Sequence, residues 1–503
     1  MIKIYFFLLL CFCAVLSAKA QKNYDIKSYG ALVSADNNSP AIQKAIDAAH
    51  AAGGGRVVIP EGRFVSGPLM LKSNVELHLQ KHAFLMGSAK IKDYGPGRMA
   101  LILADGQQNI AVTGAGTIDG QAHELVFDIT QQLHLGKIKD DLWRVKRTRE
   151  ENRTNLIYFY RCQKIKITGI KLKDASSWVQ YYKECQDMLV DSINVFSTAY
   201  WNNDGIDVVD CKNVKITNSF FNAADDAICL KSEIPNGVCE NVLIENCTLR
   251  SSANGFKLGT ASLGGFKNIT ARNLTVFDTY RAAIALETVD GGRLENVNIS
   301  HVRATNTGNA IFIRLGHRNT DSRFSAVENV VIEDVKVEVP AGKPDVGYPI
   351  EGPLPKVAPH NLVPASIVGL PGHKVKNVTL KNIEIGYGGG ASKEKAYVSI
   401  DSLNSVTENA AGYPEFTMFG ELPSWGFYVR HAEGIKFDNV KVKLDGTDFR
   451  PALVFDDVDG VTLNKVAVPQ GAPLPAVVYK GVSKLNTSAL TLPAGSNAVV
   501  NKP

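Results

Sequence analysis

A recurring phrase of the form Asn-Val-x-Ile-x-Asn-x-x-Val limits how this chain can fold more than any other feature of its sequence. Six asparagines begin the phrase, and the first four stand 28, 27 and 28 residues apart. They are Asn213, Asn241, Asn268, Asn296, Asn329 and Asn377. Such a period is too short for a propeller blade and carries no helical pattern, so it indicates a parallel β-helix. We therefore predict an all-β solenoid that occupies residues 21–503 as one domain.

The N-terminal end of this solenoid needs a cover, because its first turn would otherwise expose an open strand edge. Ser39 and Pro40 predict the start of a helix, with Ser39 as its cap and Pro40 at its first helical position. An apolar face follows, and Gly53-Gly54-Gly55 predicts the end of the helix. The face consists of Ile42, Ala45, Ile46 and Ala49. We expect this helix to cap the solenoid.

Three stretches interrupt the repeat, and insertions in a solenoid become loops on one face, often the binding face. Residues 121–155 are rich in charge, residues 340–373 are rich in Pro and Gly, and residues 386–425 contain several aromatic side chains. These insertions either wall the binding face or decorate the surface.

Residues 1–20 have the parts of a secretory signal peptide. Lys3 precedes an apolar run from Ile4 to Leu16, and Ala18-Lys19-Ala20 forms a small-x-small cleavage site. We expect a secreted or periplasmic monomer, and no later stretch is long and apolar enough to span a membrane. The formal net charge of +5 is too small to indicate a nucleic-acid-binding protein, but it is compatible with an acidic polymer as ligand.

Four cysteines occupy the same position relative to the repeat, which predicts a column with one cysteine per turn. They are Cys162, Cys185, Cys211 and Cys239. An exported protein permits disulfides, and adjacent turns are close enough to form them. A column of buried thiols is the simpler alternative. Neither a Cys-x-x-Cys motif nor clustered histidines support metal binding, so we expect no metal and no cofactor.

Two neighbouring turns carry an acidic motif. Residues 203–208 and 225–230 align at an offset of 22 residues, with their small and apolar positions coinciding. One solenoid turn of this length would place Asp204 about 4.8 Å from Asp226, with Asp225 beside them. Crowded carboxylates repel one another, so at least one should have a raised pKa. Such a split provides the acid and the base that glycoside hydrolysis requires.

A purely structural role is the alternative for these acids, because Asn and Asp tolerate the bends of a solenoid. Against it, three acids lie on two adjacent turns, and neither motif, residues 203–208 or 225–230, contains a Lys or Arg to neutralise them.

The same alignment extends over further turns and predicts two apolar core columns. One column is Ile206, Ile228, Phe256, Ile284 and Ile311, and the other is Val208, Leu230, Leu258, Leu286 and Ile313. A third column begins with Asp204 and Asp226 and continues with Asn254, Ala282 and Asn309.

With these motifs the chain resembles glycoside hydrolase family 28, the polygalacturonases and rhamnogalacturonan hydrolases. The specific part is Asn-x-Asp followed about one turn later by Asp-Asp, here residues 202–205 and 225–226, and looser matches extend the resemblance over nearly all of residues 21–503. The resemblance implies a single-stranded right-handed parallel β-helix and an inverting hydrolase. It implies Asp225 as general acid, with Asp204 and Asp226 holding the attacking water.

The chain departs from the family pattern at two basic motifs. Residues 253–255 read Ala-Asn-Gly where the family usually has Gly-His-Gly, and residues 285–287 read Ala-Leu-Glu where it has Arg-Ile-Lys. Glu287 and Arg314 either contact substrate or form an ion pair across one rung. The candidate substrate-binding residues are Asn203, Asn254, Lys257, Arg281, Glu287 and Arg314.

The predicted function is inverting hydrolysis of α-linked, uronate-containing pectic polysaccharide, with acid and base carboxyls roughly 6.5–9.5 Å apart. One alternative is a polysaccharide lyase whose Asp-rich turns hold Ca²⁺ and whose base is Lys257 or Arg281. Another is an inactive solenoid that binds pectic fragments. The paired acids favour the hydrolase, because they suit protonation of a glycosidic oxygen.

The leaving-group sugar is predicted from the missing basic motif. A uronate site usually places Arg or Lys against the carboxylate, because charge-assisted hydrogen bonds are strong and an unpaired buried carboxylate is costly. Ala285 and Glu287 would weaken such a site, whereas a neutral rhamnose would tolerate them. The sequence therefore favours a rhamnogalacturonan-type substrate over polygalacturonate. The insertions would narrow the binding face toward exo action.

Overall fold

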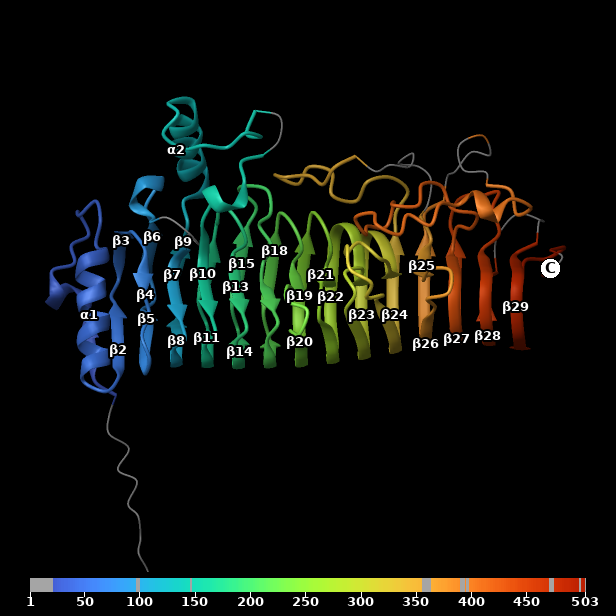
Figure 1. The fold of residues 1–503 in the computed structure, drawn as a ribbon, viewed down its shortest axis with the longest axis horizontal. Coiled ribbons are helices and arrows are strands. Elements are labelled where there is room, and N and C mark those ends of the chain that lie inside the picture. The colour runs from blue at the N-terminus through green and yellow to red at the C-terminus, as the bar shows by residue number, and fades with distance from the viewer. Residues whose placement is uncertain are drawn as a thin grey trace, which may run out of the picture.

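The computed structural model describes residues 21–95, 100–144, 147–354, 363–389, 394, 398–469, 475–496 and 499–502. The predicted signal peptide lies outside these residues. The described chain forms an elongated stack of parallel strands, with α1 (Ser39–Ala51) against its N-terminal end (Figure 1). The predicted all-β parallel solenoid with a capping helix is confirmed.

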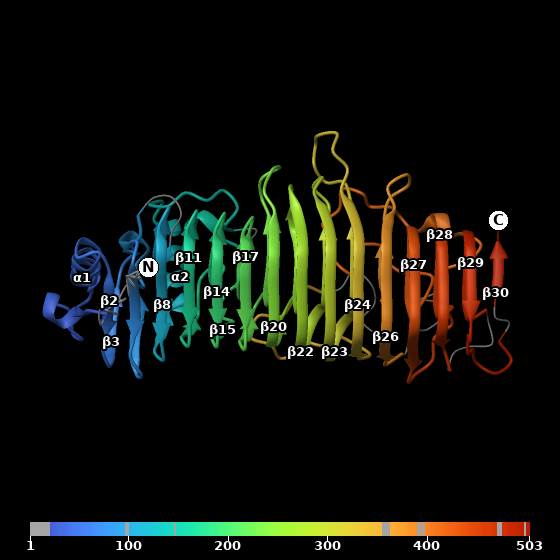
Figure 2. The same cartoon turned by 90° about the horizontal axis from the view of Figure 1, so that it is seen from below.

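Three ladders of parallel strands run along the stack. The first ladder continues through the long strands that Figure 2 shows side by side. It contains β1 (Asn23–Asp25), β2 (Gly55–Ile59), β5 (Val75–Leu79), β8 (Gln108–Gly114), β11 (Gln163–Thr168), β14 (Gln186–Asp191), β17 (Lys212–Thr217), β20 (Cys239–Ser251), β22 (Gly265–Thr288), β23 (Arg293–Leu315), β24 (Ala326–Val339), β26 (Val375–Tyr387), β27 (Phe427–Leu444), β28 (Leu453–Ala467) and β29 (Val477–Ser488).

The second ladder is shorter and merges with β20. It contains β3 (Gly62–Ser66), β6 (Ala83–Gly87), β9 (Thr117–Asp119), β12 (Lys171–Lys173), β15 (Asn194–Ser197) and β18 (Phe220–Ala223).

The third ladder is called the site face below, because the acidic motifs lie at its edge. It contains β4 (Leu69–Met70), β7 (Ala100–Asp105), β10 (Asn155–Tyr160), β13 (Gln180–Lys183), β16 (Asp207–Val209), β19 (Ile228–Ser232) and β21 (Phe256–Ser262), then the ends of β22 and β23, β25 (Ala365–Val368), the starts of β27 to β29, and β30 (Val499–Lys502).

The six repeat asparagines form a ladder of side chains at one bend of the solenoid. Each has a left-handed backbone, with φ between 54° and 59°, a conformation that Asn adopts more readily than most residues. Each Nδ2 donates to the Oδ1 of the asparagine one turn earlier, at 3.1–3.3 Å from Asn241 to Asn377. The repeat therefore marks a bend that needs both this backbone and this amide.

Both predicted apolar columns lie in the core, and each of their ten side chains is fully buried. The four cysteines stack as predicted: the backbone N–H of Cys162 donates to Sγ of Cys185, and that of Cys185 donates to Sγ of Cys211. All six described cysteines are free and buried, so the thiol column is confirmed.

The capping helix differs from its prediction by one residue. Asn38 is the N-cap, Ser39 is the first helical residue, and Pro40 follows in the first turn. The Asn37 side chain accepts the N–H of Ser39, so the capping oxygen comes from upstream of the serine. The predicted apolar face is buried.

One helix was not predicted. The first insertion contains α2 (Ala122–His134), which stands above the stack over β7 to β10 (Figure 1). Short 3-10 turns are η1 (Ile26–Tyr29), η2 (Ile91–Asp93), η3 (Glu150–Asn152) and η4 (Leu403–Ser405). Within the described residues, we find no helix with the length and apolar character needed to cross a membrane.

Candidate active site

The three acids lie on adjacent turns, immediately before the strands of the site face. Asp204 precedes β16, and Asp225 and Asp226 precede β19. These strands pair in parallel, and the N–H of Gly205 donates to the backbone oxygen of Asp226 at 2.9 Å. The predicted stacking of Asp204 on Asp226 is therefore confirmed.

The acids are crowded, as the alignment predicted. One carboxylate oxygen from each of the three lies within 4.8 Å of the other two, and the roughly 6.5–9.5 Å expected between the acid and base carboxyl groups of an inverting enzyme stays a prediction. The reason for the crowding is the solenoid itself, because residues in register on adjacent parallel strands stand about 4.8 Å apart. The separation therefore does not by itself identify an inverting enzyme.

Asp204 is held by a buried lysine from the next turn. Lys231 Nζ donates to Asp204 Oδ2 at 2.9 Å and also to Asp207, and it lies 4.3 Å from the centre of the Trp178 ring. The other Asp204 oxygen, Oδ1, has no hydrogen-bond partner. Burial raises the pKa of Asp204, and the positive charge of Lys231 opposes this rise.

Asp226 uses both carboxylate oxygens. Its Oδ1 accepts from the backbone N–H and the Nδ2 of Asn254, at 3.0 and 2.7 Å, and its Oδ2 accepts from Lys257 Nζ at 3.0 Å. Burial alone would raise the pKa of Asp226, but Lys257, Lys231 and Arg281 lower it to about 2. Asp226 is therefore ionised at neutral pH.

Asp225 has the opposite environment. Its side chain is partly exposed, its Oδ1 accepts the N–H of Asp226 at 3.0 Å, and its Oδ2 accepts Asn202 Nδ2 at 3.4 Å. Desolvation and the negative charges of Asp204 and Asp226 raise the pKa of Asp225 to about 7. Neighbouring acids thus have widely separated pKa values, as the crowding argument predicted.

Two of the predicted substrate-binding residues support the acids instead. Asn203 is fully buried; its amide donates to the backbone oxygens of Ala175 and Ser177, and its oxygen accepts from Ser197. Asn254 is buried and bonds to Asp226. Both side chains bond to protein groups and shape the acidic turns.

Lys257 and Glu287 form a buried pair beneath the acids. Their side chains are 2% and 1% exposed, with Lys257 Nζ 3.7 Å from a Glu287 oxygen. Thr260 donates to the same carboxyl at 3.3 Å. Desolvation, only partly offset by Lys257, raises the pKa of Glu287 to about 7. Neither side chain is placed to contact a substrate.

Glu287 and Arg314 do not form the ion pair that was one of the two alternatives for them. These residues are partners in the strand register, but the Arg314 guanidinium donates to the backbone oxygens of Gly369, Glu408 and Asn409. Arg314 is fully buried. It fastens the third insertion to the solenoid, so substrate contact is also excluded for it in this structure.

All three insertions reach the acidic turns. Arg153 of the first donates to Asn202 Oδ1 at 2.9 Å, and Asn202 in turn donates to Asp225. Tyr348 of the second donates to the backbone oxygen of Ala223 at 2.8 Å. The third brings the Tyr413 hydroxyl to 3.4 Å from Lys257 Nζ. The insertions therefore wall the site, which the sequence left open.

Three contributors were missed by the sequence analysis. Asp207 belongs to the first acidic motif, three residues after Asp204, and could have been found there. Trp178 lies one turn earlier, beside Lys231. Tyr413 comes from more than 180 residues downstream of Asp226, and no sequence pattern linked it to the acids.

The acidic residues of the site belong to two groups with the spacing of metal ligands. Asp204, Asp225 and Asp226 are close enough to share an ion, and so are Asp204, Asp207 and Cys229. However, Lys231 and Lys257 already bind Asp204, Asp207 and Asp226, which places two positive charges where a cation would sit. The donor set therefore fits ammonium groups better than a divalent ion.

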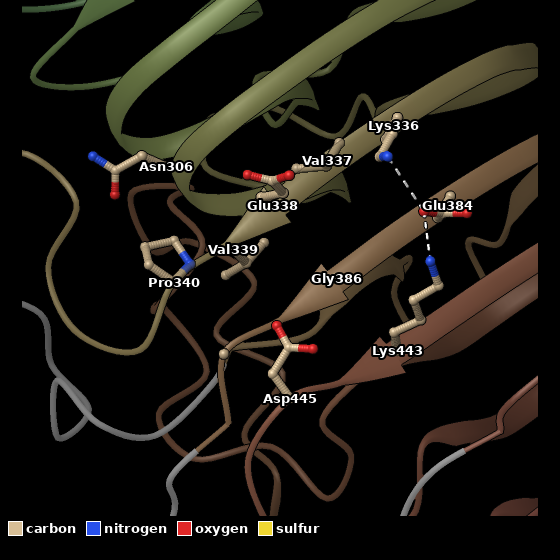
Figure 3. Close-up of a pocket in the computed structure, with 11 residues that line it drawn as sticks. Asn306, Lys336, Val337, Glu338, Val339, Pro340, Glu384, Gly386, Lys443 and Asp445 are labelled. Atoms are coloured by element: carbon tan, nitrogen blue, oxygen red, sulfur yellow. Dashed lines mark hydrogen bonds and ion pairs between the residues drawn. The ribbon is translucent and has the colours of Figure 1, made fainter.

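A separate pocket lies away from the acids (Figure 3). It is lined by the ends of β24, β26 and β27, and Glu384 binds both Lys336 and Lys443 across it. None of the predicted site residues lines this pocket.

Comparisons with known proteins agree with the fold. A model of the glycosyl hydrolases family 28 matches residues 51–351. A probable polygalacturonase of Vitis vinifera is 26% identical over 282 residues, which are 52% of this chain and 50% of the relative. An exopolygalacturonase of Zea mays is 25% identical over 407 residues, which are 75% of this chain and 83% of the relative.

Among solved structures, a hyperthermoactive exopolygalacturonase from Thermotoga maritima matches with a TM-score of 0.58 at 24% identity, covering 73% of this chain and 87% of that one. This likeness establishes a common fold. The matches span about half the length of the Vitis vinifera relative and of an exo-poly-α-D-galacturonosidase from Dickeya chrysanthemi. The family model covers more than half of this chain, and the chain therefore belongs to family 28 of the glycosyl hydrolases.

Proposed function

We propose that the protein hydrolyses α-linked, uronate-containing pectic polysaccharide, with Asp225 as general acid. The observation that carries this proposal is the division between Asp225, whose pKa is raised to about 7, and Asp226, whose pKa is lowered to about 2. A protonated and an ionised carboxyl side by side are what acid-assisted cleavage of a glycosidic bond needs.

In the proposed reaction Asp225 gives its proton to the glycosidic oxygen as the bond to the anomeric carbon breaks. A water held by Asp204 and Asp226 attacks that carbon and passes a proton to Asp204. Asp204 is the better acceptor because its Oδ1 is unpartnered, whereas both oxygens of Asp226 are occupied. Proton exchange with solvent then restores both residues.

The proposed stereochemistry is inversion, because Asp204 and Asp226 are both bound by lysines and are better placed to hold water than to attack the sugar. Retention is the competing outcome. Proton NMR of the anomeric signal during the first turnovers decides between them. An inverted first product is expected, and a retained one would mean that an aspartate acts as nucleophile.

We propose that hydrolysis occurs at a chain end. The third insertion covers the site face from β22 to β29, where the outward side chains of Ala285, Phe312 and Tyr428 are buried with Phe416 and Phe419 of that insertion. A substrate could then extend from the acids mainly toward the N-terminal turns. Product analysis on polygalacturonate should give one small sugar from the start, with a slow loss of viscosity; a ladder of oligosaccharides would indicate internal cleavage.

A rhamnogalacturonan-type substrate is the second candidate. It is favoured by Ala285 and Glu287, which leave both basic positions of the family without a cation. The burial of Glu287 against Lys257 weakens part of this argument, because a shielded carboxyl does not repel a substrate. Defined galacturonan and rhamnogalacturonan oligosaccharides, compared by initial rate, distinguish the two substrates.

A lyase reaction would give a different product. The elimination leaves an unsaturated uronate that absorbs ultraviolet light, and a Ca²⁺-dependent lyase loses activity with chelator. We expect saturated products and unchanged rates with chelator. Binding of oligosaccharides without any product would instead identify an inactive solenoid.

We also propose export of a monomer, on the basis of the signal-peptide pattern in residues 1–20. N-terminal sequencing of the extracytoplasmic protein should begin at Gln21, and light scattering should give the mass of one chain. Retention of residues 1–20, or a dimer mass, would contradict these two proposals.

A further inference from the structure

Arg281 is a charged residue of the site to which the described part of the chain supplies no hydrogen-bond acceptor. Arg153 and Arg314 use their guanidinium groups to bind backbone oxygens. The Arg281 guanidinium contacts only the Tyr413 ring, 5.6 Å from its centre, and forms no hydrogen bond or ion pair with any described residue. Its Nε is buried and unpaired.

Such an arrangement is costly without a ligand. A buried donor that lacks an acceptor loses its hydration without recovering a bond, and the cost is greater for a charged group. Burial alone would lower the pKa of Arg281, but Asp225, Asp226 and Glu415 act on it through space, and their negative charges raise its pKa. A planar guanidinium with open N–H groups is suited to bind a carboxylate through two parallel bonds.

The position of Arg281 identifies which sugar it would meet. In the repeat, Arg281 stands at the position of Asp225, two turns farther along the solenoid, and its backbone N–H donates to Ala253 on the intervening turn. Asp204, the proposed proton acceptor, lies one turn on the other side of Asp225. Arg281 and Asp204 therefore lie on opposite sides of the acid along the stack, which favours the Arg281 side for the leaving group.

We propose that Arg281 binds the carboxylate of the leaving-group sugar, with the exposed Tyr413 ring packed beside that sugar. This inference rests on the proposed hydrolase function. Arg281 and Tyr413 would together replace the two basic residues that are absent at Ala285 and Glu287. They do so from different positions, and Tyr413 belongs to the third insertion. The favoured leaving group is then a uronate and not rhamnose.

The test compares two synthetic substrates that differ only in the charge of the leaving-group sugar, one with a free galacturonate carboxyl and one with its methyl ester. The wild type is expected to favour the free acid. Arg281→Gln should lower kcat/KM for the free acid about 10- to 100-fold, the loss expected for a charge-assisted bond. The same variant should change kcat/KM for the ester less than about 2-fold. Arg281→Lys should recover part of the loss, because it keeps the charge without the planar fork.

Arg293→Gln is the matched control. It removes one positive charge from an exposed pair with Glu295 and Glu328 and should leave both substrates unaffected. Equal losses on acid and ester for Arg281→Gln would make Arg281 a structural residue and overturn the proposal. An unchanged rate on the free acid would also overturn it.

A binding measurement separates this inference from the proposed function. Calorimetric titration of galacturonate into Asp225→Asn, and into Asp225→Asn combined with Arg281→Gln, needs no catalysis. Weaker binding by the double variant supports Arg281 as the carboxylate site even if the wild type cleaves neither substrate, an outcome that would reject only the hydrolase. Equal binding by both variants overturns the proposal.

Discussion

Two columns of stacked polar side chains run along this solenoid, and they differ in which groups form their hydrogen bonds and ion pairs. In the asparagine ladder each amide donates to the identical amide one turn earlier, in exposed positions, so the column is satisfied by its own repetition. The column of Asp204, Asp226 and Asn254 is buried, and like charges cannot satisfy one another. It depends on Lys231 and Lys257, which reach it from neighbouring positions.

This difference between the two columns shows how a repetitive fold can acquire a reactive site. Repetition of a neutral residue gives a bend that can be extended over many turns. In the other column, acids on two adjacent turns create crowding, and the fold relieves it unequally. Asp226 accepts hydrogen bonds from Lys257 and Asn254. Among the described residues, no cation lies within hydrogen-bonding distance of Asp225.

Among the substitutions considered, Asp225→Asn should lower the catalytic rate the most. It removes the proton donor without changing side-chain size, and general acid catalysis contributes about 10²–10⁴-fold in rate. Steady-state kinetics should show that loss on a sugar leaving group and a much smaller one on an activated phenol. Asp187→Asn is the control, since Asp187 accepts Asn213 at 2.9 Å at the start of the asparagine ladder. Full activity of Asp225→Asn would remove it from the acid role.

The pH dependence of the rate should follow the raised pKa of Asp225. The acid works only while protonated, so kcat/KM should fall about tenfold per pH unit above about pH 7. At pH 9 the loss would be about 100-fold. A rate that stays constant to pH 9, in protein that remains folded by circular dichroism, would contradict the assignment.

Lys257→Met should have a smaller effect on rate and a distinctive effect on its pH profile. Without the ammonium the pKa of Asp226 should rise, because burial is then less opposed. We expect kcat/KM to drop roughly 10-fold near neutral pH, with the acid limb of the profile moved to higher pH. Lys267→Met, at an exposed pair with Glu295, is the control. A uniform loss at every pH would mean that Lys257 only supports the fold.

The smallest effect is expected in the asparagine ladder. Asn268→Ala removes two amide contacts and places alanine at a φ of 55°, which should cost about 1–2 kcal/mol of unfolding free energy. Activity should be unchanged. Asn268→Gly keeps the backbone conformation and should recover part of the loss in denaturant unfolding. If Asn268→Ala lowers activity, the two columns are not independent.

Much of the fold could be predicted from sequence because the repeat is local. The spacing of Asn241, Asn268 and Asn296 fixes the length of a turn, and the apolar columns follow from it. The helix α2 was not predicted although Leu125, Ile129 and Leu133 recur at helical spacing and are buried, because it lies in an insertion outside the repeat. The one-residue shift at Ser39 arose because Asn37 supplies the capping oxygen.

The site was predicted in part for the same reason. Register placed Asp204 against Asp226, but register describes only neighbours along the stack. It could not show that the side chains of Asn203 and Arg314 donate hydrogen bonds to backbone oxygens. Nor could it show that the Tyr413 hydroxyl lies next to Lys257, because Tyr413 belongs to a distant insertion.

The most direct test of the division between the acids is carboxyl-carbon NMR of the protein with ¹³C-labelled aspartate, titrated between pH 4 and pH 9. A single carboxyl that titrates near pH 7 in the wild type and is absent from Asp225→Asn is the predicted result. If the signal lost in Asp225→Asn titrates at about pH 4, as an ordinary aspartate does, the proposed division between acid and base is wrong.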